Sequence, residues 1–458
     1  MTEPAMLERA RFREVLGIAE FRVLLVAQSQ SRIGDQLARV ALALLVYDQT
    51  SSAALTTLVY ALTYLPPLLS APWLTGLADR YPRRTVMVVT DLFRAVLVAV
   101  MAIPQMPLPA VAVLLVAMTC PQPLFSGARN ATLPAILAGD RFPVGMSIVS
   151  TTDYLSQIAG FTAGGVLVAF LGGPHVALGI DALTYLVSAG LVRRGIGPHR
   201  PADGRGTSTT GRFALASIGV IWGDRRLAGI AGLLWLFGFY LAPTALAAPY
   251  AHEIGAGKAA VGILMAADLP GAVLGALLVA RIPPTVRSRL MVPLAAVTGL
   301  PLLATAMAPP LPLTLLLWAG SGVLSSYMVL AQVALSRAVP DDLRARTIGV
   351  AAAGLQTAQG LGVLLAGALA EVLSPAASIA LCSAAGSACA MLISVACRPG
   401  AIRPDGVIAS AELPAHAAPQ PYDTRANPAC CRACGPATGC SSGTACPAAG
   451  RGGSGSEW

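Results

Sequence analysis

Charged residues are scarce in this sequence, and their scarcity excludes a water-soluble protein. They make up 12% of the 458 residues, whereas hydrophobic residues make up 55%. A soluble domain carries about 25% charged residues, because it has to cover a surface that faces water. We therefore expect an integral, multi-pass protein of the cell inner (plasma) membrane.

Signals of enzyme chemistry are scarce as well. The four histidines do not occur at the spacing of a metal site, and the sequence has no Gly-Lys-Ser/Thr phosphate loop. Aromatic residues amount to 5% and are not interleaved with basic ones as on a nucleic-acid surface. We expect no enzyme and no metal, cofactor or nucleic-acid partner. Because the sequence has no nucleotide site, a transport activity would have to take its energy from an ion gradient.

Apolar runs predict an all-α fold. Runs of about 17–25 residues are long enough to cross a bilayer as helices. Arginines gather in alternate connections between these runs, which places both termini in the cytoplasm by the positive-inside rule. The exception is Lys258, the one lysine of the chain. The sequence thus predicts twelve transmembrane helices at residues 21–47, 54–78, 84–104, 109–137, 144–170, 174–194, 226–251, 259–281, 288–308, 311–337, 345–371 and 375–397.

A repeat divides these helices into two pseudo-symmetric six-helix bundles. At a shift of 202 residues Gly160 aligns with Gly362 and Gly165 with Gly367. Parallel halves around a site near the membrane midplane are common in secondary transporters. The predicted organisation is an N-terminal cytoplasmic or interfacial segment (1–20), an N-terminal bundle (21–194), a cytoplasmic linker (195–225), a C-terminal bundle (226–398) and a cytoplasmic tail (399–458).

The tail, residues 399–458, is poor in apolar residues and is expected to be disordered. Cys431 and Cys434 form a Cys-x-x-Cys, but no second pair follows at the spacing of a zinc site. We therefore expect reduced thiols and no bound metal.

The stretch TGLADRYPRR, residues 75–84, joins the second and third predicted helices. It resembles the loop signature of the major facilitator superfamily, Gly-x-Leu-Ala-Asp-Arg-x-Gly-Arg-Lys, and departs from it at Thr75 and Pro82. In that family the loop gates the cytoplasmic face, and its Asp approaches the N-terminus of helix 11, where an anion is favoured. The alternative is a solvated loop that only sets topology. The resemblance implies a gating loop formed by Asp79, Arg80, Arg83 and Arg84.

A second stretch, GFTAGG at residues 160–165, resembles the Gly-Pro-x-x-Gly-Gly antiporter motif of the drug:proton branches, with Phe161 in place of Pro. Gly160, Gly164 and Gly165 match, and the first two, one turn apart, let another helix pack closely. The resemblance implies proton antiport. RIGDQLARVALALLVYDQT, TDLFRA and IDALTYLVSAG further resemble the efflux branch that includes macrolide and enterobactin exporters.

Charged side chains within the predicted helices are candidate coupling sites, because a lone Asp at the bilayer centre costs about 2.5–3.5 kcal/mol. Asp35 shares one face of the first helix with Arg32 and Arg39. Two interpretations stay open: Asp35 exchanges its pairing with arginine for the coupled proton, or it belongs to a permanent structural ion pair. Asp268, beside Pro270, is a further proton-coupling candidate.

In the major facilitator fold, helices 1, 4, 7 and 10 line the central cavity. Few charges and several aromatic and amide side chains predict a bulky, amphipathic substrate that is neutral or singly charged. The cavity candidates are Gln28, Gln36, Gln122, Ser126, Trp235, Phe239, Tyr240, Ser325, Tyr327 and Gln332.

We expect a monomeric, lipid-embedded exporter of a small amphipathic molecule, such as a drug, siderophore or secondary metabolite, and hence a role in multidrug resistance. It would work by alternating access and proton antiport, with protons favoured over sodium by the resemblance. Two alternatives stay open. One is an importer or lysolipid flippase of the same fold, and the other is a non-transporting membrane scaffold or sensor that acts through its Cys-rich tail.

Overall fold

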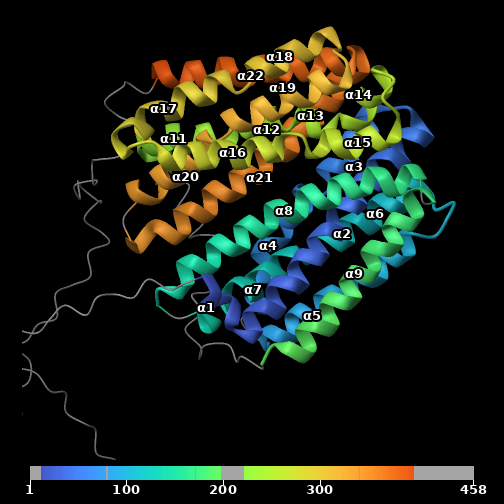
Figure 1. Cartoon of the computed structure of the whole chain (residues 1–458), viewed down its shortest axis with the longest axis vertical. Coiled ribbons are helices and arrows are strands. Elements are labelled where there is room, and N and C mark those ends of the chain that lie inside the picture. The colour runs from blue at the N-terminus through green and yellow to red at the C-terminus, as the bar shows by residue number, and fades with distance from the viewer. Residues whose placement is uncertain are drawn as a thin grey trace, which may run out of the picture. The chain divides into compact units, whose positions relative to one another are not determined.

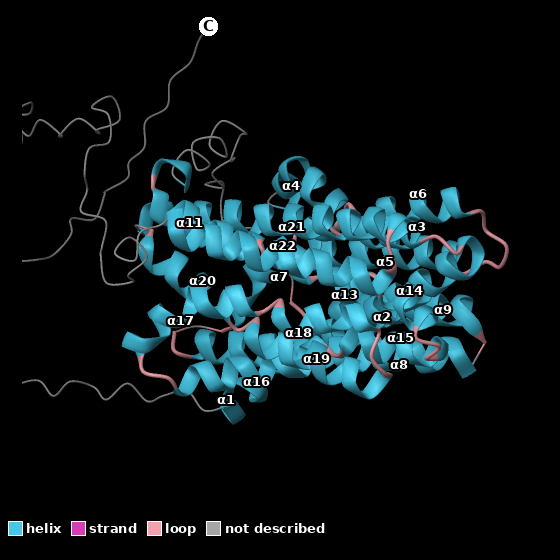
Figure 2. Cartoon of the chain, turned by 90° about the horizontal axis from the view of Figure 1, so that it is seen from above, coloured by secondary structure: helices cyan, strands magenta, loops and turns pink. Residues whose placement is uncertain are grey.

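A computed structural model of the chain describes residues 12–78, 81–137, 139–170, 172–197, 221–339 and 341–396, all within one structural unit. Every regular element in these ranges is a helix, as Figure 2 shows, so the predicted all-α class is confirmed. Asp79, Arg80, most of the linker and the tail lie outside the described residues.

The helices of the first half begin with α1 and run to α9. Each predicted span of this half contains one helix or two consecutive helices. Their bounds are α1 Phe12–Gly17, α2 Ala19–Thr50, α3 Ala53–Ala61, α4 Leu65–Ala78, α5 Arg83–Met101, α6 Leu108–Thr119, α7 Gln122–Ile136, α8 Arg141–Phe170 and α9 Gly173–Gly195.

The second half is divided into more and shorter helices. Proline causes part of this division, because it removes a backbone donor and collides with the preceding turn; Pro243, Pro249 and Pro270 each lie just after such a break. The bounds are α11 Arg225–Trp235, α12 Phe237–Tyr240, α13 Ala242–Ala245, α14 Ala247–Glu253, α15 Gly257–Ala266, α16 Asp268–Arg281, α17 Pro284–Val297, α18 Leu300–Leu303, η1 Ala304–Met307, α19 Leu311–Leu324, α20 Tyr327–Ala338, α21 Asp341–Val372 and α22 Pro375–Ala396.

Within the described ranges, nine helical stretches, each made of one to three consecutive helices, are long and apolar enough to cross a membrane. Helices α2, α5 and α8 are not among these nine, because they carry several charged side chains or are rich in hydroxyl and amide side chains. These three helices carry most of the polar residues described below. The count of twelve transmembrane helices therefore stays a prediction.

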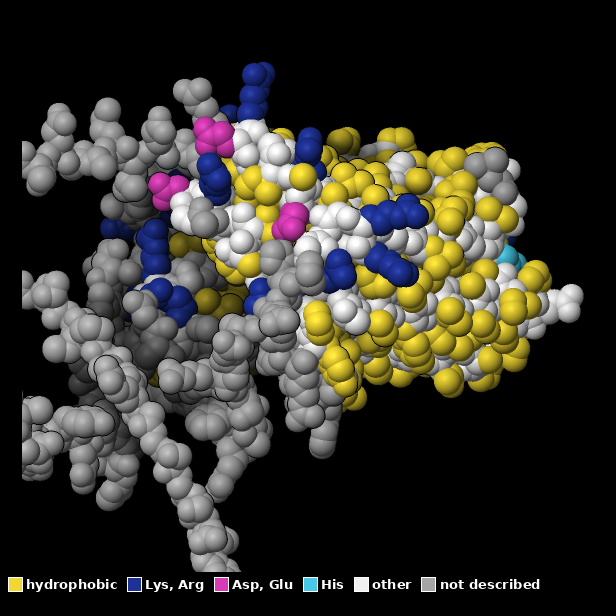
Figure 3. Space-filling view, turned by 90° about the horizontal axis from the view of Figure 1, so that it is seen from below, with side chains coloured by type: hydrophobic (Ala, Val, Ile, Leu, Met, Phe, Trp, Pro, Cys, Tyr) yellow, Lys and Arg dark blue, Asp and Glu magenta, His cyan; other side chains and the backbone are white. Residues whose placement is uncertain are grey.

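The helices form two groups that follow the order of the chain. In Figure 1 the blue-to-green helices α1–α9 lie together, and the yellow-to-red helices α11–α22 lie together beside them. On the face shown in Figure 3, hydrophobic side chains cover the right-hand part, and Lys and Arg side chains lie over the left and middle. A protein embedded in a membrane requires such a hydrophobic surface where it faces the lipid.

The 202-residue repeat reappears in the contacts of its glycines. A Cβ added to Gly165 would lie 2.6 Å from the Ala259 carbonyl oxygen, and one added to Gly367 would lie 1.7 Å from Thr57 Oγ1. Thr57 and Ala259 are themselves 202 residues apart. The two halves thus contact each other through a symmetric pair of close helix crossings, α8 with α15 and α21 with α3.

Polar contacts surround these crossings at one end of the helices, which we call the Lys258 end. Lys258 Nζ donates to Asp48 Oδ2 at 2.6 Å. Glu371 accepts from Ser52 Oγ at 2.6 Å and from the Ala54 backbone N–H at 2.8 Å, at the N-terminus of α3. These groups are exposed, and exposed ion pairs contribute about 0–1 kcal/mol each. The contacts therefore join the two halves at the Lys258 end, and breaking them costs little free energy.

Close glycine packing at the Lys258 end gives a testable prediction. A Cβ added to Gly262 would lie 2.2 Å from the Phe161 carbonyl oxygen, on the other half. Overpacking costs about 1–3 kcal/mol, so Gly262→Val should shift the equilibrium between the closed and open states about tenfold or more toward the open state. The measurement is the yield of cross-linking between Asp48→Cys and Lys258→Cys. The control is Gly179→Val, since nothing lies within 4 Å of a Cβ added to Gly179; equal yields in the two variants would contradict the prediction.

Candidate functional site

A stripe of polar side chains runs along α2. Gln28, Arg32, Asp35 and Arg39 recur at intervals of three and four residues, so they share one helix face. Neighbouring helices can approach α2 closely because of glycine: a Cβ added to Gly160 of α8 would lie 2.8 Å from Gln36 Cβ. The polar stripe of α2 is therefore within reach of side chains from α8 and α9.

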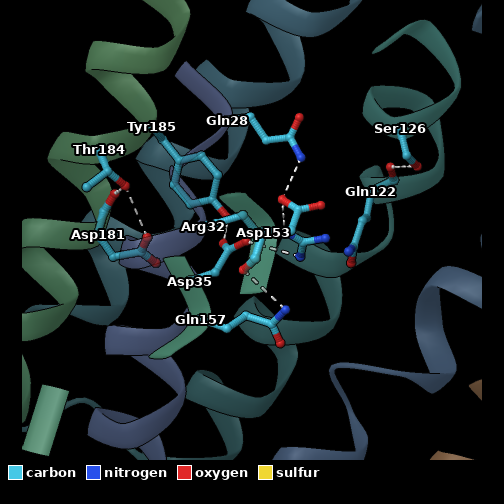
Figure 4. Close-up of polar contacts among 10 residues, drawn as sticks. All are labelled: Gln28, Arg32, Asp35, Gln122, Ser126, Asp153, Gln157, Asp181, Thr184 and Tyr185. Carbon is cyan, nitrogen blue, oxygen red and sulfur yellow. Dashed lines mark hydrogen bonds and ion pairs between the residues drawn. The ribbon is translucent and has the colours of Figure 1, made fainter. Parts of the chain in front are cut away.

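Asp35 is held between an arginine and a tyrosine. The Tyr185 hydroxyl of α9 donates a hydrogen bond to Asp35 Oδ1, and Arg32 Nη1 lies 4.0 Å from Asp35 Oδ2 (Figure 4). The predicted neighbour Arg39 does not form an ion pair within this distance among the described residues; its guanidinium lies 5.8 and 5.6 Å from the ring centroids of Tyr60 and Tyr64. Asp35 and Arg39 line the same small cavity, of about 40 Å³.

Asp153, on α8, is the counterpart of Asp35 on the other side of Arg32. Gln28 Nε2 donates to Asp153 Oδ1 at 2.7 Å, and Arg32 Nε lies 3.8 Å from the same oxygen (Figure 4). The site residues predicted from the sequence did not include Asp153. Its position two turns before Gly160, on a helix that must pack closely on α2, was the available signal.

Two more carboxylates lie in the interior of the first half. The Ser188 hydroxyl donates to Asp91 Oδ2 at 2.6 Å, and Thr184 Oγ1 lies 3.3 Å from Asp181 Oδ1. Both carboxylates are buried, with exposed fractions of 1% and 0%. The Arg94 guanidinium lies over the Phe125 and Tyr185 rings, at 5.8 and 5.6 Å. This interior is therefore rich in charge by the standard of membrane helices, where charged residues mark functional paths.

A cavity of about 400 Å³ lies between the two halves. Its lining comes from α8 on one side and from α12, α16, α20 and the α19–α20 junction on the other. Of the predicted site residues it contains Asp268, Ser325 and Gln332. Asp268 is the first residue of α16, and a helix N-terminus favours a carboxylate.

The aromatic wall of the cavity differs from the predicted one. Trp235, Phe239 and Tyr240 do not line it; Trp235 donates to the Ala351 carbonyl at 3.1 Å and Tyr240 to the Ala295 carbonyl at 2.7 Å, both inside the second half. The lining aromatics are Tyr154 and Phe237. Phe237 is the first residue of α12, after the break that ends α11 at Trp235, so the spacing of one unbroken helix does not predict which aromatic side chain lines the cavity.

The other predicted cavity residues lie inside one half or the other. Tyr327 is fully buried, 6.4 Å from the Tyr240 ring. Gln36 is 1% exposed, and Gln122 lines the small cavity beside Asp35. Ser126 donates to the backbone oxygen of Gln122 at 2.7 Å, within its own helix.

The described part of the predicted gating loop binds within its own half. Arg83 Nη1 donates to the Ala131 carbonyl at 2.6 Å, and Arg84 Nη1 to the Ile196 carbonyl at 3.4 Å. These carbonyls lie near the C-terminal ends of α7 and α9, where cations are favoured. Asp79 and Arg80, the other two residues of the loop, lie outside the described residues.

The glycines of the GFTAGG stretch pack against two different helices, α2 and α15. Gly160 and Gly164 pack on α2, where added Cβ atoms would lie 2.6 Å from the Ile33 carbonyl oxygen and 3.0 Å from Val40 Cβ. Gly165 faces α15 of the other half, as described above. The stretch therefore connects packing inside the first half to the contact between halves.

Solved structures of several membrane transporters have the same arrangement of helices as this chain and show its fold. The nucleoside transporter NupG matches with a TM-score of 0.66 and 15% identity, covering 82% of this chain and 98% of that one. The peptide transporter POT in complex with sulfate matches with 0.64 and 13%, covering 86% and 99%. A bacterial homologue of the human lysosomal transporter Spinster, in an inward-facing and occupied conformation, matches with 0.59 and 14%, covering 82% and 94%.

The sequence then identifies the family. Residues 14–430 match the MFS_3 family, described as transmembrane secretion effector, and the chain belongs to this family. An uncharacterized MFS-type transporter of Bacillus subtilis (strain 168), YfiS, is 29% identical over 184 residues, which is 40% of this chain and 43% of that protein. The match thus spans less than half the length of that relative. The predicted resemblance to major facilitator transporters is confirmed, and its efflux branch stays a prediction.

Proposed function

We propose that this protein exports a small amphipathic molecule in exchange for protons, by alternating access. The observation that carries the proposal is the cavity between the halves, with carboxylates on both sides and a connection through Arg32 to the interior Asp35. A site at the interface of two repeats is where such transporters bind substrate.

The positive-inside rule supports the orientation that export needs. It places the Lys258 end outside the cell and the Arg-rich connections in the cytoplasm. Because the halves contact each other at the Lys258 end, substrate would enter the cavity from the cytoplasm in this conformation. Opening the Lys258 end and closing the other would then release it outside.

In this scheme Asp35 carries the proton. Its carboxylate faces Arg32 and accepts a hydrogen bond from Tyr185. Protonation of Asp35 would weaken its attraction to Arg32 and so change which groups Arg32 binds. Asp268 is a second carboxylate available to protons, on the opposite wall of the cavity.

The gating loop has a separate role in the proposal. Asp79 and Arg80 would meet the N-terminal end of α21 when the cytoplasmic side closes, while Arg83 and Arg84 hold the loop against α7 and α9. The proposed substrate is a drug, a siderophore or a secondary metabolite. The protein would work while embedded in the lipid bilayer.

The experiment is transport of a panel of fluorescent amphipathic dyes in everted membrane vesicles, with and without a proton uncoupler. Uptake into everted vesicles that the uncoupler abolishes is the expected result. Accumulation in energised intact cells would instead indicate an importer. The protein could also transport none of the dyes, and its cellular phenotype could disappear when residues 399–458 are deleted. These two results together would indicate a non-transporting scaffold or sensor that acts through the Cys-rich tail.

A further inference from the structure

We propose that a groove on the outer face of α9 binds an anionic phospholipid of the cytoplasmic leaflet, with the lipid phosphate on Arg193 and Arg194. The groove shares no lining residue with the cavity between the halves or with the small cavity beside Asp35. The proposal goes beyond the export function and takes from it only the orientation of the chain. In Figure 1, α9 lies on the side of the first half that is turned away from the second half.

The helix α9 has two faces of opposite character. Successive residues of a helix lie about 100° apart around its axis. Asp181 and Tyr185 therefore share one face, which is buried against the helices of the first half. The opposite face carries the exposed apolar side chains of Leu183, Leu186 and Val187. Apolar side chains exposed on a membrane helix contact the hydrocarbon chains of lipids.

The groove lies on this exposed face, near the C-terminal end of α9. Gly190 leaves the face open, because nothing lies within 4 Å of a Cβ added to it. The volume of the groove is about 680 Å³, which is within the usual range for ligand sites of about 300–1,000 Å³. Its described lining residues are Leu186, Val187, Gly190, Leu191, Arg193 and Arg194. The groove thus combines an apolar part with two guanidinium groups, and a phospholipid has the matching chain and phosphate.

The two arginines of the groove are available to a ligand. Arg193 and Arg194 are exposed in the last turn of α9. Neither has a hydrogen-bond or ion-pair partner within the described part of the chain. A guanidinium group donates in a planar fork that matches the oxygens of a phosphate. Basic clusters at the cytoplasmic ends of membrane helices attract anionic lipids.

The other polar groups at this end of α9 leave it positive. The carbonyl groups at a helix C-terminus carry partial negative charge and disfavour an anion. Arg84 of α5 compensates for them, because its Nη1 donates to the Ile196 carbonyl at 3.4 Å. Glu20 of α2 adds one carboxylate, which accepts from the Gly197 backbone N–H at 3.0 Å. Three arginines against one glutamate give a net positive charge that favours a phosphate.

A phospholipid fits the groove better than a second copy of the chain or a soluble anion. A symmetric contact between two copies would bring the two arginine pairs together, and like charges repel. A soluble anion would use the arginines alone and would make no favourable contact with Leu186 and Val187. The bound lipid would lie within one helical turn of the Ile196 carbonyl, and so beside the contact that holds Arg84 of the gating loop.

The test is native mass spectrometry of the purified full-length protein with equal amounts of phosphatidylglycerol and phosphatidylcholine that have the same acyl chains. The native protein should retain the anionic phosphatidylglycerol with a preference of about tenfold. The double variant Arg193→Gln/Arg194→Gln should retain both lipids about equally. The control is Arg281→Gln/Arg337→Gln, which removes the same charge from the last turns of α16 and α20, and it should keep the native preference.

A second pair of variants tests the groove itself. Gly190→Leu should fill it and lower retention of phosphatidylglycerol about tenfold, since the lipid chain would lose its place beside the arginines. Gly179→Leu is the matched control and should bind the lipid as the native protein does. Gly179 lies on the same exposed face, eleven residues earlier, and nothing lies within 4 Å of a Cβ added there either.

Four results would overturn the assignment. The native protein could show no preference for phosphatidylglycerol, or the two arginine double variants could lose the preference equally, which would indicate general attraction to a basic surface. Displacement of the lipid by an equal concentration of glycerol 3-phosphate would assign the arginines to a soluble anion. A dimer that disappears in Arg193→Gln/Arg194→Gln would assign the face to a second copy. None of these measurements involves transport, so their outcome is independent of the proposed export.

Discussion

Replacing Asp35 by asparagine is expected to abolish uncoupler-sensitive export of the fluorescent amphipathic dyes, down to the level of vesicles that lack the protein. Asparagine resembles the protonated carboxyl group and cannot release a proton. Transport in everted vesicles, with and without the uncoupler, measures the effect.

Glu14→Gln is the control for this variant, since it removes a negative charge from an exposed position. The prediction depends on the contacts of Asp35 with Tyr185 and Arg32, both of which respond to its charge. Export that survives in Asp35→Asn would assign Asp35 to a permanent structural ion pair, the interpretation that the sequence left open.

Cross-linking the Lys258 end should stop transport reversibly. In a background whose native cysteines are replaced, Asp48→Cys and Lys258→Cys are joined by a short, reducible bis-thiosulfonate reagent. The native side chains meet at 2.6 Å across the two halves, so the link holds this end closed. We expect uncoupler-sensitive export to fall to background after cross-linking and to recover on reduction.

Each single-cysteine variant treated with the same reagent is the control for modification itself. The exposed ion pair contributes at most about 1 kcal/mol, so breaking it without a cross-link should leave most of the export intact. Full export by the cross-linked protein would exclude opening of the Lys258 end from the transport cycle.

The sequence by itself determined the class of this protein and much of its helical layout. Twelve per cent of charged residues cannot cover a water-exposed surface, and apolar runs of about 17–25 residues predict helices, which the structure places at the predicted spans. The stripe of Gln28, Arg32 and Asp35 was also predictable, because three- and four-residue spacing places side chains on one helix face whatever lies opposite.

Only the tertiary structure decided what lies opposite that stripe. Tyr185 is 150 residues from Asp35 and Asp153 is 125 residues from Gln28, and helical periodicity does not determine which helix faces which. The same limit explains the aromatic wall, where Phe237 takes the place expected for Phe239. Close approach at Gly160 and Gly165 fixes these neighbours, since a contact between backbones leaves little freedom in how two helices cross.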